Sequence, residues 1–148
     1  NDASTTLPRL LDMGIEPFLI TSTINVAIGQ RLVRTLCFDC KVERELTEGQ
    51  LQSLKGLVPE EFLTGSQSFS VGIGCKKCDM SGFKGRIGIH EVLEINDDIR
   101  ELIMKRVNSK ELRDAAIKNG MVTMLQDGLE KARAGVTTIE EVLRVFHE

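Results

Sequence analysis

The chain of 148 residues contains no Trp and no Tyr, and its 6 Phe are its only aromatic side chains. Since 41% of the residues are nevertheless hydrophobic, Leu, Ile, Val and Met can form a core, and wholesale disorder is disfavoured. Scarce aromatic side chains and a net charge of −3 also disfavour a nucleic-acid-binding domain, which usually presents stacking rings and a basic surface. We therefore expect one ordinary domain, or a piece of a larger one, with no nucleic-acid partner.

Long apolar runs are also missing. No stretch approaches the roughly 20 apolar residues of a membrane-spanning helix, so we expect no transmembrane segment. The N-terminal NDASTT has neither the basic region nor the apolar region of a secretory signal. These absences predict a cytoplasmic location, and the lack of an initiator Met suggests an excised fragment.

Familiar catalytic motifs are absent as well. The sequence has no GxxxxGK[ST] phosphate-binding loop and no GxGxxG loop after a predicted strand. No arrangement of Ser, His and Asp resembles a nucleophilic triad. We therefore assign no catalytic and no nucleotide-binding residue in this chain.

Four cysteines are the main chemical feature that the chain does have. Cys37, Cys40, Cys75 and Cys78 are spaced C-x₂-C-x₃₄-C-x₂-C. A CxxC turn directs two thiolates toward one point, and two such turns complete the tetrahedral Cys₄ site that suits Zn²⁺. Because four cysteines leave no position for water, the pattern predicts structural rather than catalytic zinc.

Other uses of the cysteines fit the sequence less well, apart from an iron site. A thioredoxin-type redox site needs one CxxC pair that opens a helix, whereas this chain has two pairs. Structural disulfides are rare in cytoplasmic proteins. An iron site with the same ligands stays open as an alternative to zinc. The two histidines, His90 and His147, are not needed as ligands.

Two alternating segments flank the cysteines. Residues 26–34 place Val26, Ile28 and Leu32 on one side, and residues 86–95 alternate more clearly. We expect an antiparallel pair of strands with the cysteine region at its end. Between the cysteine pairs, Thr47 and Gln50 predict a capped short helix carrying Leu51, Leu54 and Leu57, and residues 58–74 are expected to be irregular.

Helices are expected at both ends of the chain. Thr5 or Thr6 is predicted to cap the first helix, with Pro8 in its first turn, and a second helix is predicted to begin near Pro17. After Ile95 we expect four more helices. Asn96 or Asp97 is predicted to cap the first of these and Ser109 the second. The third is expected near 123–134, and Thr138 paired with Glu141 is predicted to cap the fourth.

Five segments occur in the order of a known family: RLLDMGIEPFLI, QRLVRTLC, the two CxxC pairs, GFKGRIGIHEVLEI and DGLEKARAGVTTIEEVLRV. Over its full length the chain resembles the C-terminal part of the type II secretion and type IV pilus assembly ATPases. The four cysteines match the tetracysteine zinc motif of the secretion and pilus-extension branch, which retraction-type members generally lack. The resemblance implies an α/β fold (an α+β fragment) in four parts: the end of a RecA-like ATPase core (1–36), a zinc-binding lobe (37–85), a returning core strand (86–95) and a C-terminal helical lobe (96–148).

The same resemblance implies a function for the parent protein. The parent would be a homo-hexameric ATPase at the cytoplasmic side of the inner membrane. It would use ATP hydrolysis to rotate or displace an inner-membrane platform protein and so drive pilin or pseudopilin assembly. ATP and Mg²⁺ would bind upstream of this chain, so the fragment would supply the zinc site and contacts to neighbouring subunits or the platform. Arg31 and Arg34 can reach a nucleotide or a neighbouring subunit, but solvated arginines are commoner on such strands. The alternative is a free-standing zinc-binding interaction module.

Overall fold

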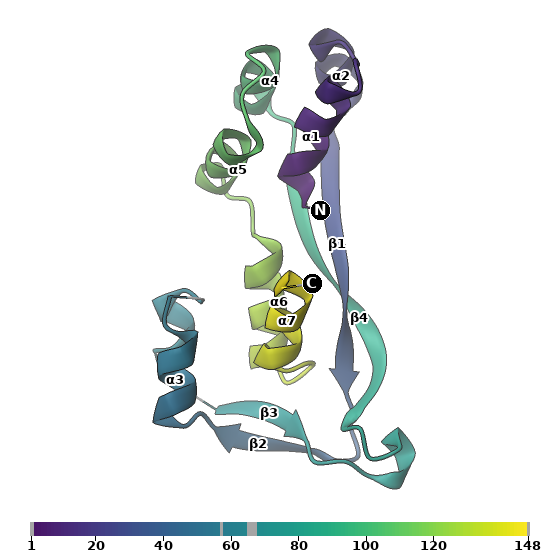
Figure 1. Cartoon of the computed structure of the whole chain (residues 1–148), viewed down its shortest axis with the longest axis vertical. Helices are drawn as coiled ribbons and strands as arrows, with labels where there is room; N and C mark the ends of the chain where they lie inside the picture. Colours follow the sequence, from purple (N-terminus) through teal and green to yellow (C-terminus); the bar gives the residue numbers. More distant parts are fainter. Residues whose placement is uncertain (1, 57, 65–67, 148) are drawn as a thin grey trace. The chain divides into compact units, whose positions relative to one another are not determined.

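The computed structural model describes residues 2–56, 58–64 and 68–147 and has a mixed α and β fold (Figure 1). Its strands are β1 (Val26–Leu36), β2 (Lys41–Glu45), β3 (Ser68–Gly72) and β4 (Phe83–Glu94). The α-helices are α1 (Ala3–Asp12), α2 (Pro17–Thr23), α3 (Glu48–Leu54), α4 (Asp97–Met104), α5 (Ser109–Lys118), α6 (Met124–Arg133) and α7 (Ile139–His147). Two short 3₁₀ helices are η1 (Glu60–Phe62) and η2 (Lys76–Cys78). Asn1 and Leu57 lie outside the described residues.

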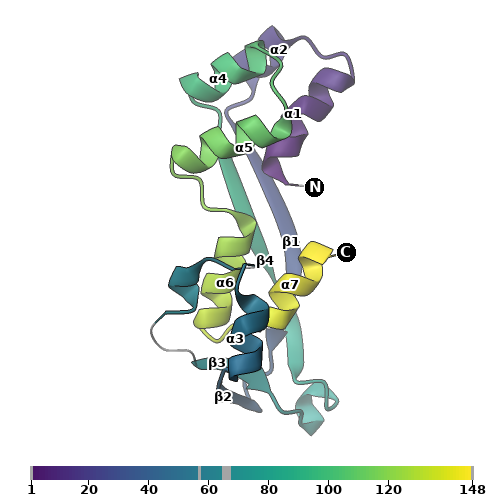
Figure 2. The same cartoon turned by 60° about the vertical axis from the view of Figure 1, so that its left-hand side comes forward.

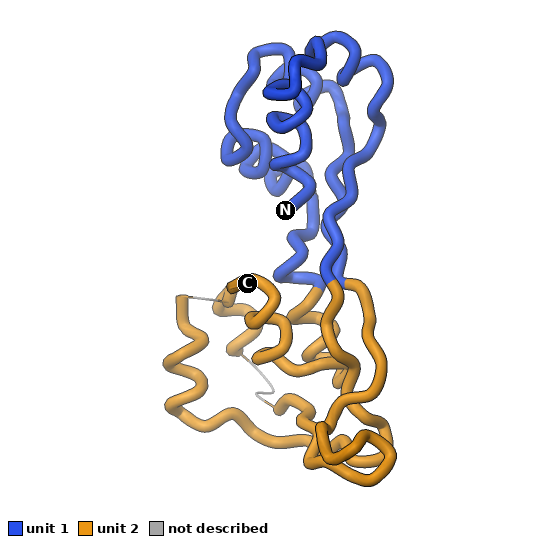
Figure 3. Tube along the Cα trace, turned by 45° about the vertical axis from the view of Figure 1, so that its right-hand side comes forward, with its two compact units in different colours: residues 1–31, 89–127 blue, residues 32–88, 128–148 orange. Residues whose placement is uncertain are grey.

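The chain divides into two compact units, each built from two separate stretches (Figure 3). Unit 1 comprises residues 1–31 and 89–127, and unit 2 comprises residues 32–88 and 128–148. Strands β1 and β4 and helix α6 each contribute residues to both units. The four-part division implied by the family resemblance remains a prediction about domains. In the division into compact units, residues 96–127 belong to unit 1 and residues 128–148 to unit 2.

Strands β1 and β4 pair with each other, as the flanking alternating segments predicted. The amide of Ile95 donates to the carbonyl of Asn25, and the amide of Cys37 donates to the carbonyl of Gly82, both at 2.9 Å. Since the start of each strand lies beside the end of the other, the pair is antiparallel.

The face of β1 that turns inward is not the one with the larger apolar residues. Val26, Ile28 and Leu32 are 47%, 60% and 49% exposed, whereas Ala27 and Val33 on the opposite face are buried. On β4 the inward positions include Ile89 and Leu93, as their alternation predicted, and also a glutamate, Glu91.

Unit 1 packs helices α1, α2, α4 and α5 around one apolar cluster. Its buried members are Ala3, Leu7, Leu11, Ile20, Ala27, Leu93, Ile95, Ile99, Ile103, Leu112 and Ala116. The carboxylate of Glu91 is 1% exposed and accepts hydrogen bonds from the backbone amides of Ala3 and Met124. Arg113 donates to the same carboxylate at 3.2 Å. Glu91 therefore joins strand β4 to the N-termini of α1 and α6 and to the side of α5.

Two of the predicted helix caps are wrong, that of α5 by one residue and that of α1 by three or four. Asp2 caps α1 by accepting from the amide of Thr5, so the helix begins earlier than predicted and Pro8 lies inside it rather than in its first turn. Asn108 caps α5 in place of Ser109, which is the first residue of that helix. The caps predicted for α3 and α4 are confirmed: Thr47 with Gln50, and Asn96.

Unit 2 contains a two-stranded ribbon that the sequence did not indicate. Strand β2 pairs antiparallel with β3, from Lys41 opposite Gly72 to Glu45 opposite Ser68. The expectation that residues 58–74 are irregular is therefore wrong for 68–72. One end of the ribbon adjoins the cysteines, and α3 follows at the other end (Figure 2).

A second buried glutamate fixes helix α7 to β1 in this unit. The backbone amide of Glu141 donates to Oγ1 of Thr138, as the predicted capping box requires, and the carboxylate of Glu141, which is 1% exposed, faces arginines. The backbone amide and the guanidinium of Arg34 donate to it at 3.0 and 2.8 Å, and Arg144 donates to both of its oxygens. The guanidinium of Arg34 also lies 4.2 Å from the ring centre of Phe83. Arg34 thus has structural contacts within its own unit.

Candidate metal centre

The four cysteines come from two turns that the β2–β3 ribbon brings together. Cys37 and Cys40 occupy the turn between β1 and β2. After β3, Cys75 is the N-cap of η2 and Cys78 is its last residue. The amide of Ile73 donates to the carbonyl of Cys40 at 3.2 Å, which holds the second turn against the first. Residues more than thirty positions apart therefore lie side by side.

The sulfur atoms form one compact group. All four Sγ atoms lie within 4.8 Å of one another. The pairs Cys37–Cys75 and Cys40–Cys78 are each 3.8 Å apart, and Cys75–Cys78 is 3.7 Å apart. Four sulfurs placed about 2.3 Å from a zinc ion in a regular tetrahedron are about 3.8 Å from each other. The four cysteines can hold a metal ion, and their spacing fits tetrahedral zinc.

Two glycines allow the chain to close around this group. A Cβ atom on Gly72 would lie 2.2 Å from the carbonyl oxygen of Gly82, and one on Gly82 would lie 2.5 Å from that of Gly72. Because backbone faces backbone, no side-chain movement can relieve such a clash. Gly82 and Gly85 also have φ of 78° and 87°, the left-handed conformation that favours glycine at the exit from the cysteine turn.

The environment shifts the pKa values of the thiols in different directions. Burial raises the pKa of Cys40 to about 12 and also raises the pKa of Cys75. Burial acts on Cys78 in the same sense, but the backbone amides of Cys75 and Gly82 donate to its Sγ at 3.3 Å and bring its pKa down to about 6. Hydrogen bonds to a thiolate stabilise its charged form. The two amides therefore favour the thiolate form of Cys78, which is the form that binds a cation.

An ion pair joins the two turns on their outer side. Nζ of Lys77 lies 2.6 Å from Oδ1 of Asp39, and each residue is the third position of its CxxC turn. The pair is largely solvent-exposed and contributes little free energy. Its effect is to link the two CxxC turns to each other at the surface.

Other residues singled out in the sequence lie elsewhere. Across the described residues, the cysteine group is the one cluster of at least three metal-ligating side chains, and it contains neither histidine. His90 instead donates its backbone amide to Asp127 at 2.8 Å. Sequence reasoning missed the buried carboxylates of Glu91 and Glu141; Glu91 could have been found, because it falls on the inward positions of the alternating β4 segment.

None of the helices in the part of the chain that the structure describes combines the length and apolarity needed to cross a membrane.

Comparison with known proteins gives a consistent picture. The family model described as "Type II/IV secretion system protein" matches residues 1–144. The chain is 39% identical to the type IV pilus assembly ATPase PilB of Myxococcus xanthus over 97% of its own length and 25% of that protein. It is 42% identical to type II secretion system protein E of Pectobacterium carotovorum and 39% identical to type II secretion system ATPase E of Vibrio cholerae, over 100% of its length and 28% of each relative. The chain thus spans about a quarter of the length of these relatives.

Proposed function

Since the chain belongs to the family of type II/IV secretion system proteins, we propose that it is the C-terminal part of a motor ATPase of type II secretion or type IV pilus assembly. The observation that carries the proposal is the match of nearly the whole chain to ATPases of both systems, together with a sulfur cluster of metal-binding geometry. In this proposal residues 1–36 and 86–95 complete a RecA-like core.

ATP hydrolysis in this proposal belongs to the parent protein. The 148 residues contain no phosphate-binding loop, so ATP and Mg²⁺ would be held by other parts of the polypeptide. The parent would act as a homo-hexamer on the cytoplasmic side of the inner membrane. Its conformational changes would move a platform protein and so drive pilin or pseudopilin assembly.

The four cysteines would bind one structural Zn²⁺, which would cross-link the β1–β2 turn to η2. Structural zinc contributes about 10–16 kcal/mol of apparent binding free energy in small peptides, compared with about 5–15 kcal/mol for the whole stability of a typical domain. The β2–β3 ribbon buries few side chains, and all five residues of β2 are exposed. The ribbon therefore needs the cross-link more than the helical parts do.

A cross-linked ribbon has a mechanical use in a motor. A lobe that does not deform can transmit the movement of its subunit to a neighbouring subunit or to the platform protein. The alternative, a free-standing zinc-binding interaction module, shares the metal site and differs in lacking ATPase activity.

The test uses the complete gene product that contains this chain, purified with and without a Cys75→Ser substitution. We expect ATP hydrolysis by the parent, about one zinc ion per chain, and loss of both zinc and secretion or piliation in the variant. Lys110→Ala, an exposed substitution in α5, is the matched control and should leave zinc content and activity unchanged. A gene product without a phosphate-binding loop and without ATPase activity would refute the motor and support the module.

A further inference from the structure

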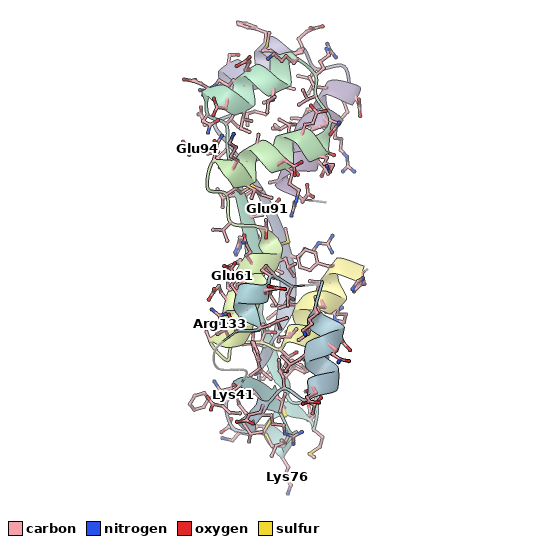
Figure 4. All side chains as sticks on the ribbon, turned by 90° about the vertical axis from the view of Figure 1, so that its left-hand side faces the viewer. Lys41, Glu61, Lys76, Glu91, Glu94 and Arg133 are labelled. Atoms are coloured by element: carbon pink, nitrogen blue, oxygen red, sulfur yellow. The ribbon has the colours of Figure 1, made fainter. Side chains whose placement is uncertain are left out.

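The four cysteines of the cluster differ in their access to solvent. Cys37 is 0% exposed, and Cys40 and Cys78 are each 5% exposed. Cys75 is the one member of the four that is partly exposed. It lies at the start of η2, and the side chain of the next residue, Lys76, points away from the lobe into solvent (Figure 4). A small reagent in solution therefore meets Cys75 before the other three cysteines.

Access becomes the deciding factor once a metal ion is bound. Free thiols differ in reactivity because they differ in their fraction of thiolate. A thiol that coordinates a metal has already lost its proton, so the four ligands are alike in this respect. The remaining difference among them is which sulfur a reagent in solution can approach.

We infer that Cys75 is an oxidation site, at which hydrogen peroxide attacks the metal-loaded cluster and releases the metal. This inference rests on the metal site of the proposed function and adds regulation of that site by oxidation. The lobe is then rigid under reducing conditions and loosened by peroxide.

The reaction balances with peroxide as the oxidant. The thiolate of Cys75 attacks one peroxide oxygen, the O–O bond breaks, and a sulfenic acid and a hydroxide ion form. A second thiolate then attacks the sulfenic sulfur, an S–S bond forms, and a second hydroxide leaves. Two thiolates have lost two electrons, and the peroxide has gained them.

The second thiolate is available without movement of the fold. Sγ of Cys75 lies 3.7 Å from Sγ of Cys78 and 3.8 Å from Sγ of Cys37. Either disulfide removes two of the four ligands, and the two that remain cannot retain zinc tightly. Thiol reductants reverse the disulfide and restore the site.

The experiment follows oxidation and metal release in the unaltered chain. The zinc-loaded chain is treated with a limiting amount of hydrogen peroxide, released zinc is measured with a chromogenic chelator, and the oxidation state of each cysteine is mapped by mass spectrometry after alkylation. We expect Cys75 to be oxidised at least about tenfold faster than Cys40, with zinc released in step and regained after reduction. Equal rates at all four cysteines, earlier oxidation at Cys37 or Cys40, or oxidation of Cys75 without zinc release would each overturn the inference.

A pair of variants separates the role of the thiol from that of the ligand. Histidine is also a zinc ligand but does not form disulfides. Cys75→His should slow zinc release by peroxide several-fold, whereas Cys40→His should release zinc as fast as the unaltered chain. If histidine at either position prevents zinc binding, the mapping of the unaltered chain decides. Zinc content is measured first: a chain that binds no zinc refutes the proposed metal site, whereas a loaded chain with unselective oxidation refutes only the role of Cys75.

Discussion

The carboxylate of Glu141 offers the most quantitative prediction about stability. This carboxylate is buried, and burial alone would raise its pKa. Hydrogen bonds from Arg144 and Arg34 outweigh burial and lower the pKa from 4.5 to about 2. One pKa unit corresponds to about 1.4 kcal/mol, so the charged form contributes about 3 kcal/mol to folding at neutral pH. We expect Glu141→Gln to lower the free energy of unfolding by about that amount at pH 7.

The sign of the pH dependence follows from the lowered pKa. A carboxyl group whose pKa is lower in the folded state stabilises fully above its unfolded value, near 4.5, and loses this contribution as the pH falls toward 2. The difference between the unaltered chain and Glu141→Gln should therefore be constant from pH 8 to 6. At pH 3 it should have fallen by about 2 kcal/mol. Because both proteins carry the same cysteines, metal loss in acid affects both curves and cancels in their difference.

Urea unfolding followed by circular dichroism measures this difference. Glu140→Gln is the matched control, because Glu140 is the adjacent glutamate of α7 and is exposed. It should change the free energy of unfolding by less than about 0.5 kcal/mol. A Glu141→Gln effect no larger than that of the control, or one that does not depend on pH, would refute the assignment of stability to this ion pair.

Two further substitutions test the packing of each unit. Gly72→Ala places a methyl group against the backbone of Gly82, so we expect zinc affinity in a chelator competition to fall at least about tenfold, whereas Gly49→Ala, with open space around it, should leave affinity unchanged. Glu91→Gln removes the charge that Arg113 and two helix amides share, so urea unfolding should show a loss of about 2–3 kcal/mol. The exposed Glu94→Gln is its control, and equal effects of the two would contradict the role given to the buried carboxylate.

The cysteine group could be predicted from sequence because its pattern is local. Each CxxC turn contains its own two ligands, and the remaining question was only whether the two turns meet. The Sγ distances of 3.7 and 3.8 Å answer that they do. Which metal binds is a matter of chemistry that ligand spacing leaves open, because iron and zinc accept the same four thiolates.

The β2–β3 ribbon could not be predicted because its strands lack the usual signal. Alternation of apolar and polar residues arises when one face of a strand is buried, and β2, with the sequence KVERE, is exposed along its whole length. Its pairing is enforced by the ends of the strands, where Lys41 lies opposite Gly72 beside the cysteine turns. Pairing between segments this far apart in the sequence produces no pattern that a short stretch of residues would reveal.

The helix caps show a finer limit. Asp2, Thr5 and Thr6 are all capable of capping, and so are Asn108 and Ser109. The choice between neighbours depends on which residue adopts extended backbone angles, and the packing of the helix decides that. The sequence therefore predicted that the helices exist, but it did not always predict the residue at which each begins.

The division of each unit between two separate stretches has a consequence for synthesis on the ribosome. Unit 1 cannot close before residues 89–127 have been made, and unit 2 cannot close before residues 128–148 have been made. The four cysteines, the Gly82 amide that donates to Cys78 and the β2–β3 ribbon are all complete once residue 82 has been made. In a nascent chain that emerges N-terminus first, metal capture can thus precede the packing of either unit, and the ribbon can be fixed while its surrounding helices are still being translated.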